Sequence, residues 1–417
     1  MMPTALPGPA ASTEALLDAV QRQTLRYFWD FAHPVCGLAR ERSNGLPDTI
    51  ATGGSGFGLM AILAGAERGW IERPAALERL LTSVRFLGNA ARHHGAFPHW
   101  MNGNTGATRP FGPTDEGGDI VETAYLMAGL LAVRQYFRGR GKKERELRAL
   151  IDGLWSTVEW DWYARDGDVL IWHWSPKHGW AMNHPVRGWN ECLIAYVLAA
   201  SSPTHAIAPR AYHEGWASGP QFLNGRSFYG IPLPLGPDFG GPLFFAHYSF
   251  LGLDPRGLSD RYADYWEQNV AHTRINREHC IRNPNGFAGY GADCWGLSAS
   301  DSVAGYAAHA PDHDLGVITP TAALSSFPYA PEACMDALRG FASLGDRLWT
   351  EHGFRDAFSP DSGWDAPSCL AIDQGPIVAM IENYRSGLLW RLVMSCREIR
   401  RGLKRLGFAR HVPAPAA

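Results

Sequence analysis

Four carboxylates lie within eight residues at the start of one strongly apolar stretch. Residues 115–137 read DEGGDIVETAYLMAGLLAVRQYF, and the acidic positions are Asp115, Glu116, Asp119 and Glu122. The remainder is apolar on nearly every face, which predicts a helix buried on all sides. Carboxylates at the start of such a helix must be solvated in a pocket, paired or protonated. Crowded carboxylates repel one another and raise a pKa, which is the setting for general acid and base catalysis.

The same spacing also fits a helix cap. Asp119 and Glu122 form D-x-x-E ahead of an apolar run, which is close to a capping box. The two interpretations are compatible, because a cap accounts for one or two acids and not for four. Gly117 and Gly118 allow close backbone approach, so Asp115 and Asp119 can turn into one small volume.

Two further apolar segments begin with an acid, namely Glu191 in GWNECLIAYVLAASS and Asp373 in DQGPIVAMIENYRSGLLW. Each acid alone has a structural explanation, since the helix dipole favours a negative charge at the N-terminus. If these helices form the inner wall of a barrel, their starts converge on one mouth. A general acid there needs a raised pKa, so burial or mutual repulsion must outweigh the dipole. The predicted catalytic residues are Glu191, Asp373, Asp119, Glu122 and Asp115.

The sequence lacks the motifs of several other kinds of functional site. The chain has no G-x-S-x-G, and its seven cysteines form no C-x-x-C. His93, His94 and His99 have no fixed ligand spacing, so we expect no metal and no cofactor. The G-x-G within 37–58 follows no predicted strand and precedes no GKS/T, which argues against a nucleotide site.

The composition limits the classes of partner that we expect this protein to bind. A formal charge of −3 gives no reason to expect nucleic acid, and no run of 18 apolar residues predicts membrane insertion. The beginning, MMPTALPGPAAS, lacks a signal-peptide pattern, which predicts a cytoplasmic protein as written, or a periplasmic or secreted one if a signal was removed. The pattern leaves the oligomeric state open.

Aromatic residues are abundant, with 16 Trp and 14 Tyr, and several lie in loops rich in Gly and Pro. Such side chains can stack on the flat apolar faces of sugar rings, and each could equally anchor its loop. Two acids beside an aromatic cleft fit glycoside hydrolysis, in which one carboxyl protonates the leaving oxygen and another activates water or attacks. The predicted substrate-binding residues are Trp172, Tyr290, Trp295, Tyr384 and Asn190.

The elements that would position these residues are mostly helices. The pattern predicts about a dozen helices and few strands, and helices that are apolar all round alternate with one-sided ones. It predicts an all-α protein with two concentric layers of helices and short hairpins. We expect a disordered tail at 1–11, a single domain at 12–407 and a C-terminal tail at 408–417. A hairpin is expected within 164–187, an irregular excursion at 219–242 and a helix at 242–251.

Several segments resemble one known family in the family's order. Residues 52–87, TGGSGFGLMAILAGAERGWIERPAALERLLTSVRFL, resemble the opening of the bacterial glucoamylase-like domain, the group that contains glycoside hydrolase family 144. Similarity continues over about residues 20–394, through DEGGDIVETAYLMAGLLAVRQYF, GWNECLIAYVLAASSPTHAI, GYGADCWGLSASD, ITPTAALSSFPYAPE, GFRDAFSP and IDQGPIVAMIENYRSGLLW. The resemblance implies an (α/α)6 barrel and inverting hydrolysis of β-1,2-glucan. The family's acidic site residues match Asp115, Asp119, Glu122, Glu191 and Asp373.

The resemblance leaves alternatives open, because related families of this fold share the substrate and differ in endo or exo action. Our hypothesis is an endo-acting hydrolase of β-1,2-glucan or sophorooligosaccharides. The alternatives are an exo-acting hydrolase, a transglycosylase, or a glycan-binding protein without catalysis. Because Asp119 and Glu122 share one helix face, we predict Glu191 as the general acid and Asp373 as the base, directly or through water. Asp115, Asp119 and Glu122 would bind sugar hydroxyls or relay protons, and one of them is the alternative base.

Overall fold

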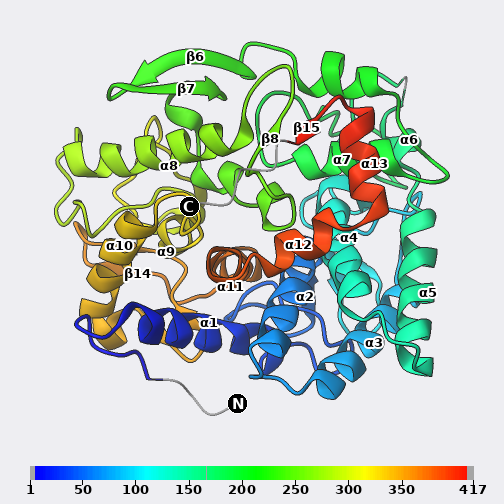
Figure 1. Cartoon of the computed structure of the whole chain (residues 1–417), viewed down its shortest axis with the longest axis horizontal. Coiled ribbons are helices and arrows are strands. Elements are labelled where there is room, and N and C mark those ends of the chain that lie inside the picture. Colours follow the sequence, from blue (N-terminus) through cyan, green and yellow to red (C-terminus); the bar gives the residue numbers. More distant parts are fainter. Residues whose placement is uncertain (1–4, 166, 411–417) are drawn as a thin grey trace.

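The computed structural model describes residues 5–165 and 167–410, whose helices form two concentric rings (Figure 1). The inner segments are buried along nearly their whole length: α2 (Thr52–Glu67), α4 (Ile120–Tyr136), α7 (Leu193–Ser201), η3 (Leu243–Ala246) with η4 (Ser249–Leu251), α9 (Pro320–Leu324) and α11 (Ala371–Arg385). The outer segments bury one side: α1 (Thr13–Trp29), α3 (Arg73–Asn89), α5 (Lys142–Ser156), η1 (Ala211–Trp216), α8 (Tyr265–Arg282) and α10 (Pro331–Ser343). This alternation is the predicted (α/α)6 barrel.

Besides the two rings, the described residues contain five further helical segments. These are α6 (Trp160–Tyr163), η2 (Asp238–Gly240), η5 (Gly345–Arg347), α12 (Leu388–Met394) and α13 (Arg397–Arg405). None of the helices in the described ranges combines the length and hydrophobicity that a membrane span requires. Residues 1–4 and 411–417 of the predicted tails lie outside the described residues.

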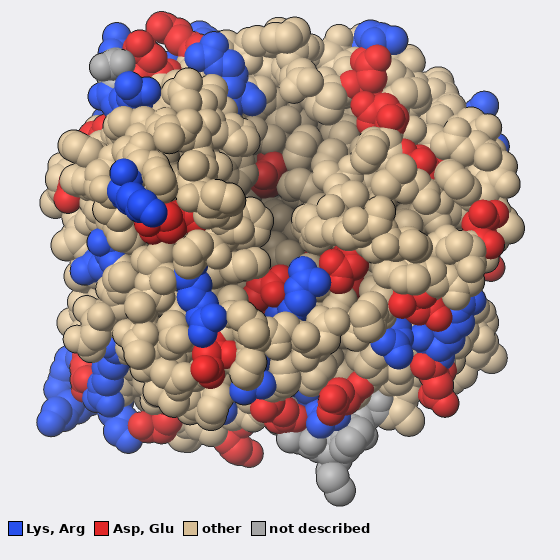
Figure 2. Space-filling view, turned by 180° about the vertical axis from the view of Figure 1, so that it is seen from behind, with Lys and Arg blue, Asp and Glu red and all other residues tan. Residues whose placement is uncertain are grey.

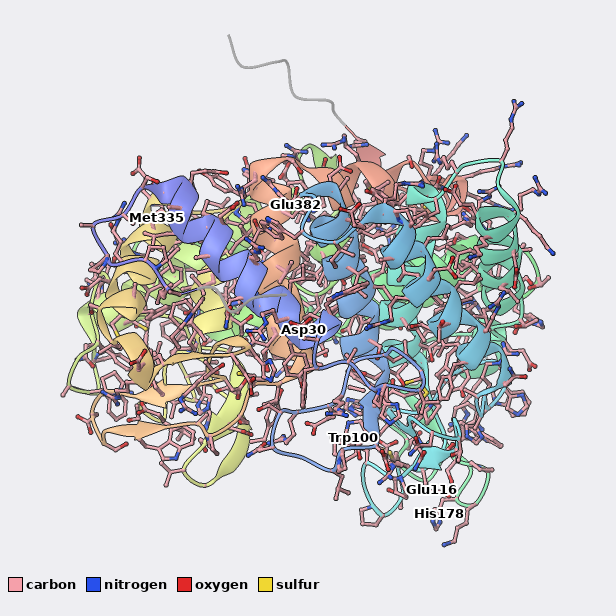
Figure 3. All side chains as sticks on the ribbon, turned by 90° about the horizontal axis from the view of Figure 1, so that it is seen from below. Asp30, Trp100, Glu116, His178, Met335 and Glu382 are labelled. Carbon is pink, nitrogen blue, oxygen red and sulfur yellow. The ribbon has the colours of Figure 1, made fainter. Side chains whose placement is uncertain are left out.

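The strands are short and antiparallel and belong to the loops between helices. They pair as β1 (Thr49–Ala51) with β2 (Trp100–Asn102) and β3 (Thr108–Arg109), β4 (Gly118–Asp119) with β5 (His173–Trp174), β6 (Leu223–Phe228) with β7 (Ile231–Leu235), β8 (Leu258–Ser259) with β15 (Ala409–Arg410), β9 (Ala299–Ser302) with β10 (Gly305–Ala308), β11 (Trp349–Thr350) with β12 (Gly353–Phe354), and β13 (Phe358–Ser359) with β14 (Trp364–Asp365). Trp100 and Glu116 lie at one end of the barrel, and Glu382 lies at the other (Figure 3). The N-termini of α2, α4 and α11 point to the end that carries Trp100.

Glycine sets the spacing of the inner helices. A Cβ on Gly56 of α2 would come inside 3.0 Å of the Tyr125 backbone, and a Cβ on Gly129 of α4 would meet the carbonyl of Gly56. On the other side of α2, a Cβ on Gly54 would lie 2.7 Å from the Cβ of Ala371. The backbones of α2 and α4 therefore touch, and α2 fits between α4 and α11, as expected for a glycine-rich segment that permits close helix packing.

Three local predictions differ from the structure. Residues 219–242 contain the hairpin β6–β7, whose two-residue turn has positive φ at Tyr229 (55°) and Gly230 (80°). Positive φ at both positions matches the right-handed strand twist, but Tyr-Gly is a weaker sequence signal than Asn-Gly. The predicted helix at 242–251 forms two 3₁₀ turns. The hairpin expected within 164–187 is present in part, through the antiparallel bridges Ile171–Pro185 and Ser175–Gly179, but β5 inside this segment pairs with β4.

Gly56→Ala should destabilise the fold by at least roughly 2 kcal/mol, because its Cβ meets backbone atoms that no rotamer change can move away. The matched control is Gly153→Ala on α5, where a Cβ has open space and the helix propensity of alanine should stabilise by about 0.5–1 kcal/mol. Urea unfolding measures both variants. Equal stability of Gly56→Ala and the wild type would contradict the backbone contact.

Candidate active site

A cavity of about 370 Å³ lies at the end of the barrel where the inner helices begin. Figure 2 shows this face with a deep central hollow and acidic atoms at its wall. Its lining includes three glutamates and one arginine, namely Glu41, Glu122, Glu191 and Arg42. Its aromatic lining residues are His99, Trp100, Phe111, Tyr125, Trp172, Phe244, Tyr248 and Tyr306. Carboxylates among aromatic rings are the combination expected of a sugar-binding cleft.

Asp119 is a completely buried carboxylate with four donors. Its Oδ1 accepts hydrogen bonds from the backbone amides of Val121 (3.0 Å) and Glu122 (2.9 Å), which caps α4. Its Oδ2 accepts from Nδ1 of His99 (2.9 Å) and from the indole of Trp172 (3.0 Å). The capping interpretation of Asp119 is confirmed. The other oxygen of Asp119, Oδ2, holds His99 and Trp172 in place, and both of these residues line the cavity.

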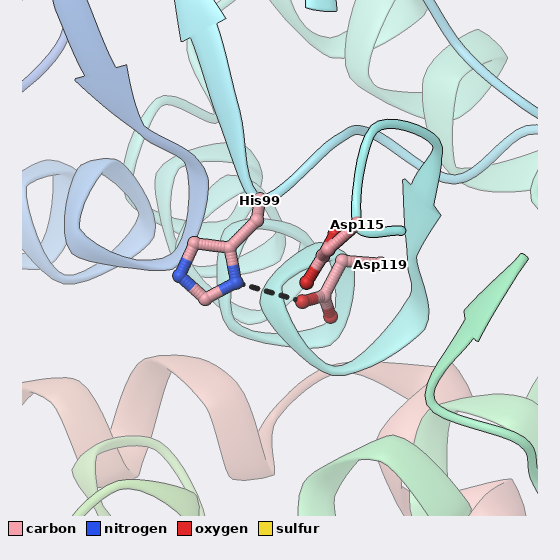
Figure 4. Close-up of side chains that lie close together, drawn as sticks. All are labelled: His99, Asp115 and Asp119. Carbon is pink, nitrogen blue, oxygen red and sulfur yellow. Dashed lines mark hydrogen bonds and ion pairs between the residues drawn. The ribbon is translucent and has the colours of Figure 1, made fainter. Parts of the chain in front are cut away.

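His99 is a cavity residue that the sequence analysis considered only as a metal ligand. Its ring stacks on Phe111 at 4.0 Å between centroids and hydrogen-bonds Asp119 (Figure 4). Burial alone would favour the neutral ring, but the negative charges of Glu122, Asp119 and Asp115 raise the pKa of His99 to about 9. The imidazolium therefore supplies a positive charge among the carboxylates at neutral pH.

His99, Asp115 and Asp119 are also the residues that could hold a metal ion. One ligand atom from each lies within 4.8 Å of the others, and Figure 4 shows the three side chains together. A cation there would have to displace the proton that His99 shares with Asp119. Because Asp119 already has four donors, the arrangement fits an imidazolium better than a metal.

Asp115 lies behind the cavity lining, and its carboxyl group faces His173. Its Oδ1 is 3.1 Å from Nε2 of His173, and the same nitrogen accepts the amide of Gly117 at 3.1 Å. That nitrogen is therefore an acceptor and carries no proton, as in a neutral His173 ring. Burial and then the charge of Asp119 raise the pKa of Asp115 to about 6, while burial lowers the pKa of His173.

Glu122 and Glu191 both line the cavity. Oε2 of Glu122 accepts the amide of Gly53 at 2.6 Å, and Gly53 has no side chain in the way. Burial, opposed by the His99 charge and reinforced by Asp119, raises the pKa of Glu122 to about 7. Glu191 is 9% exposed, and burial together with the charges of Glu122 and Asp119 raises its pKa to about 7.

Asp373 belongs to a second group of buried acids. It is 2% exposed, and burial and then the charge of Asp356 raise its pKa well above the usual range. Burial also raises the pKa of Asp356 to about 7, and its Oδ2 accepts the amide of Asp301 at 2.7 Å. Asp373 does not line the cavity, but Tyr248 does. Burial and then the negative charges of Asp373 and Glu191 raise the pKa of the Tyr248 phenol.

Arg42 connects the second acidic group to the mouth of the cavity. Its guanidinium binds both oxygens of Asp301 (3.1 and 3.2 Å) and both oxygens of Glu41 (2.9 and 3.0 Å). Asp301 lies on β9, so the ion pair holds the β9–β10 hairpin, from which Tyr306 reaches the cavity while 53% exposed. The loop segments containing Arg42 and Asp301 carried no helical periodicity that could have identified them.

The predicted substrate-binding residues divide into one cavity residue and four that lie elsewhere. Trp172 lines the cavity, and its substrate-binding role stays a prediction. The prediction for Trp295 is wrong, because its side chain is 0% exposed and its indole donates to the Ala333 carbonyl as a packing anchor. Tyr384 lies in the last turn of α11, far from the mouth at which Asp373 begins the helix.

Tyr290 and Asn190 are held by neighbouring groups outside the cavity lining. The hydroxyl of Tyr290 donates to Asp314 at 2.9 Å. The amide oxygen of Asn190 accepts from the amide of Cys192 (3.0 Å) and from the indole of Trp216 (3.1 Å). These hydrogen bonds to Asn190 shape the turn that presents Glu191, while the substrate-binding role of Asn190 stays a prediction.

Several aromatic lining residues were missed, although they lie beside segments that the sequence analysis had selected. Phe111 precedes the acidic stretch, Trp100 follows the histidine-rich loop, and Tyr306 follows GLSASD. Their position in loops was visible in the sequence. Which loop aromatics face a cavity depends on tertiary packing, so periodicity could not select them.

The fold and this cavity define a carbohydrate-active (α/α)6 enzyme, and comparisons with known proteins agree. A family model described as putative glucoamylase matches residues 183–397. The chain belongs to this glucoamylase-like family of glycoside hydrolases. A putative glucoamylase from Bacteroides uniformis is 58% identical, with a TM-score of 0.95 and coverage of 96% of this chain and 98% of that one.

Two other relatives have more specific names. An endo-β-1,2-glucanase from Chitinophaga pinensis, solved with sophorotriose and glucose, is 53% identical, with a TM-score of 0.94 and coverage of 96% of this chain and 99% of that one. An exo β-1,2-glucooligosaccharide sophorohydrolase from Parabacteroides distasonis is 47% identical over 94% of this chain. The chain spans 58% of the length of that relative.

Glu191→Gln should stabilise the protein more at pH 8 than at pH 5. The folded-state pKa of Glu191 is about 7 against a usual 4.5, so the folded state binds more protons between these values. Stability therefore falls as pH rises through this window, and glutamine avoids a loss of up to roughly 3 kcal/mol. Urea unfolding at both pH values measures the difference. A variant that gains nothing between pH 5 and pH 8 would show that Glu191 ionises normally.

Proposed function

We propose that the protein hydrolyses β-1,2-glucan with inversion, and that Glu191 is the general acid. The observation that carries the proposal is a buried carboxyl group with a pKa of about 7 that faces an aromatic cavity. At neutral pH a large fraction of such a group is protonated, so it can donate to a glycosidic oxygen. The aromatic walls suit the apolar faces of glucose rings.

We infer the proposed substrate and mode of action from the related proteins. Both relatives with specific names act on β-1,2-linked glucose chains. The endo-acting relative is matched over 99% of its length, whereas the exo-acting relative extends well beyond the part that this chain matches. This difference in coverage favours endo action, with exo action as the second candidate.

The pair Asp356 and Asp373 suits the role of the base. The two buried carboxyls hold a first proton tightly, because the pKa of Asp373 is raised well above its usual range. A second proton binds with the pKa of about 7 at Asp356, so the pair can accept a proton near neutrality. Because neither carboxyl lines the cavity, the proton of the attacking water would reach the pair through an intervening hydroxyl or water, with Tyr248 beside the route.

The acidic stretch would support both steps. Asp119 holds His99 and Trp172, and the His99 cation offers its free edge to sugar hydroxyls or to developing negative charge. Glu122, opposite Glu191 in the lining, is the alternative base. The hydrogen bond from Gly53 and the positive charge of His99 each favour the ionised form of Glu122, against the effect of burial.

Incubation with linear β-1,2-glucan should produce a ladder of oligosaccharides. Proton NMR of the first products should show the α-anomer at the new reducing end, as inversion requires. A single small product would indicate exo action, products longer than the substrate would indicate a transglycosylase, and binding without turnover would indicate a glycan-binding protein. Activity confined to α-1,4-glucan would refute the proposed substrate.

Glu191→Gln and Asp373→Asn should each reduce kcat by at least roughly 100-fold, because each removes a group that transfers a proton. Both variants should remain folded. Glu116→Gln is the matched control, since Glu116 belongs to the acidic stretch but does not line the cavity. In the wild type, kcat should fall as pH rises above about 7, where Glu191 loses its proton. Near-normal turnover by Glu191→Gln together with loss of activity in Glu122→Gln would move the acid role to Glu122.

A further inference from the structure

A second cavity, of about 600 Å³, is lined partly by α6. Figure 1 shows α6 at the periphery of the barrel. The cavity is formed by α6 with the turn after it, by the loop that carries Trp180 and by the segment after α7. Its lining residues are Glu159, Asp161, Trp162, Arg165, Trp180 and His205. None of them lines the active-site cavity, so this is a separate site.

The aromatic surface of this cavity is a platform of two tryptophans. Trp162 is 39% exposed, although tryptophan is usually well covered. One face of its ring stacks on His94 at 3.8 Å between centroids. Trp180 lies 6.1 Å from Trp162 at an interplanar angle of 32°, which is direct ring contact and leaves no room for a ligand between the rings. The guanidinium of Arg165 lies 5.4 Å from the centre of the Trp180 ring.

The rim of the platform carries hydrogen-bonding groups that remain accessible. Glu159 pairs with His94 at 2.9 Å, and Asp161 pairs with His205 at 3.0 Å. Their side chains are partly exposed, so free carboxylate lone pairs can accept hydroxyl donors, and Arg165 can donate to hydroxyl oxygens. Two carboxylates beside one guanidinium disfavour a phosphate or a nucleotide. The chemistry fits a neutral ligand with flat apolar faces and many hydroxyls.

We propose that the platform of Trp162 and Trp180 binds a segment of a glucan chain outside the catalytic cavity. The inference rests on the proposed function, since a polymeric substrate extends beyond the residues that are cleaved. A chain of packed residues connects the two sites. Trp174 on β5 packs edge-on against Trp162 at 6.1 Å, and β5 pairs with β4, where His173 lies opposite Asp119. A chain held on the platform is thereby kept close to the catalytic cavity.

Trp162→Ala and Trp180→Ala should raise the apparent KM for long β-1,2-glucan roughly fivefold or more, as expected for the loss of one stacking tryptophan. They should leave kcat on the polymer, and kcat/KM on a short sophorooligosaccharide, within about twofold of the wild type. Leu223→Ala is the matched control, because Leu223 is an exposed apolar side chain outside both cavities. Unchanged KM on the polymer, or an equal loss on polymer and oligosaccharide, would overturn the proposal.

Native electrophoresis in gels that contain β-1,2-glucan separates this inference from the proposed function. The wild type should be retarded by the polysaccharide, and Trp162→Ala should be retarded less. Arg165→Ala is a second variant that leaves the packing of His94 intact, and it should also be retarded less. Lack of hydrolysis by the wild type would refute the proposed function alone. Equal retardation of the wild type and both variants would refute the platform, whatever the outcome of hydrolysis.

Discussion

The backbone contact between Gly56 of α2 and Gly129 of α4 sets the distance between two inner helices, and the rest of the site depends on it. Any side chain at either position would separate the helices. With the backbones in contact, the start of α2 brings the amide of Gly53 to within 2.6 Å of Glu122. The cavity is therefore a consequence of helix packing, and Glu122 is attached to one of these closely packed inner helices.

The same packing explains why the pKa values of Glu191 and Asp373 are raised. Dense apolar helices leave little water around Glu191 and Asp373, and the cost of burying a charge is partly avoided by protonation. Asp119 is different, because its two oxygens accept hydrogen bonds from four donors. One stretch of sequence thus holds an acid that organises the site and a neighbour, Glu122, whose pKa lies near 7. Catalytic groups of this kind reduce stability, which a large core can tolerate.

The sequence was sufficient to predict the layers and two carboxylates that line the cavity, Glu122 and Glu191, but not the surroundings of these acids. Glu191 precedes a helix that is apolar on every face, and such a pattern indicates an inner helix with its start at the mouth. Arg42 and Asp301 are 259 positions apart in sequence and meet only through tertiary structure. Trp295 and Trp172 look alike in sequence, since both lie in glycine-containing loops. Their roles differ because one indole faces a backbone carbonyl in the core and the other faces Asp119.

The central claim is that burial keeps a large fraction of Glu191 protonated at neutral pH, and the titration of Glu191 tests that claim most directly. Carbon-13 NMR of protein labelled at the glutamate carboxyl groups, with Glu191→Gln used to assign the resonance, follows this one group through pH. The account predicts a midpoint near pH 7, well above the usual 4.5. A midpoint near the usual value would mean that Glu191 is ionised at neutral pH, and it would contradict the proposed acid.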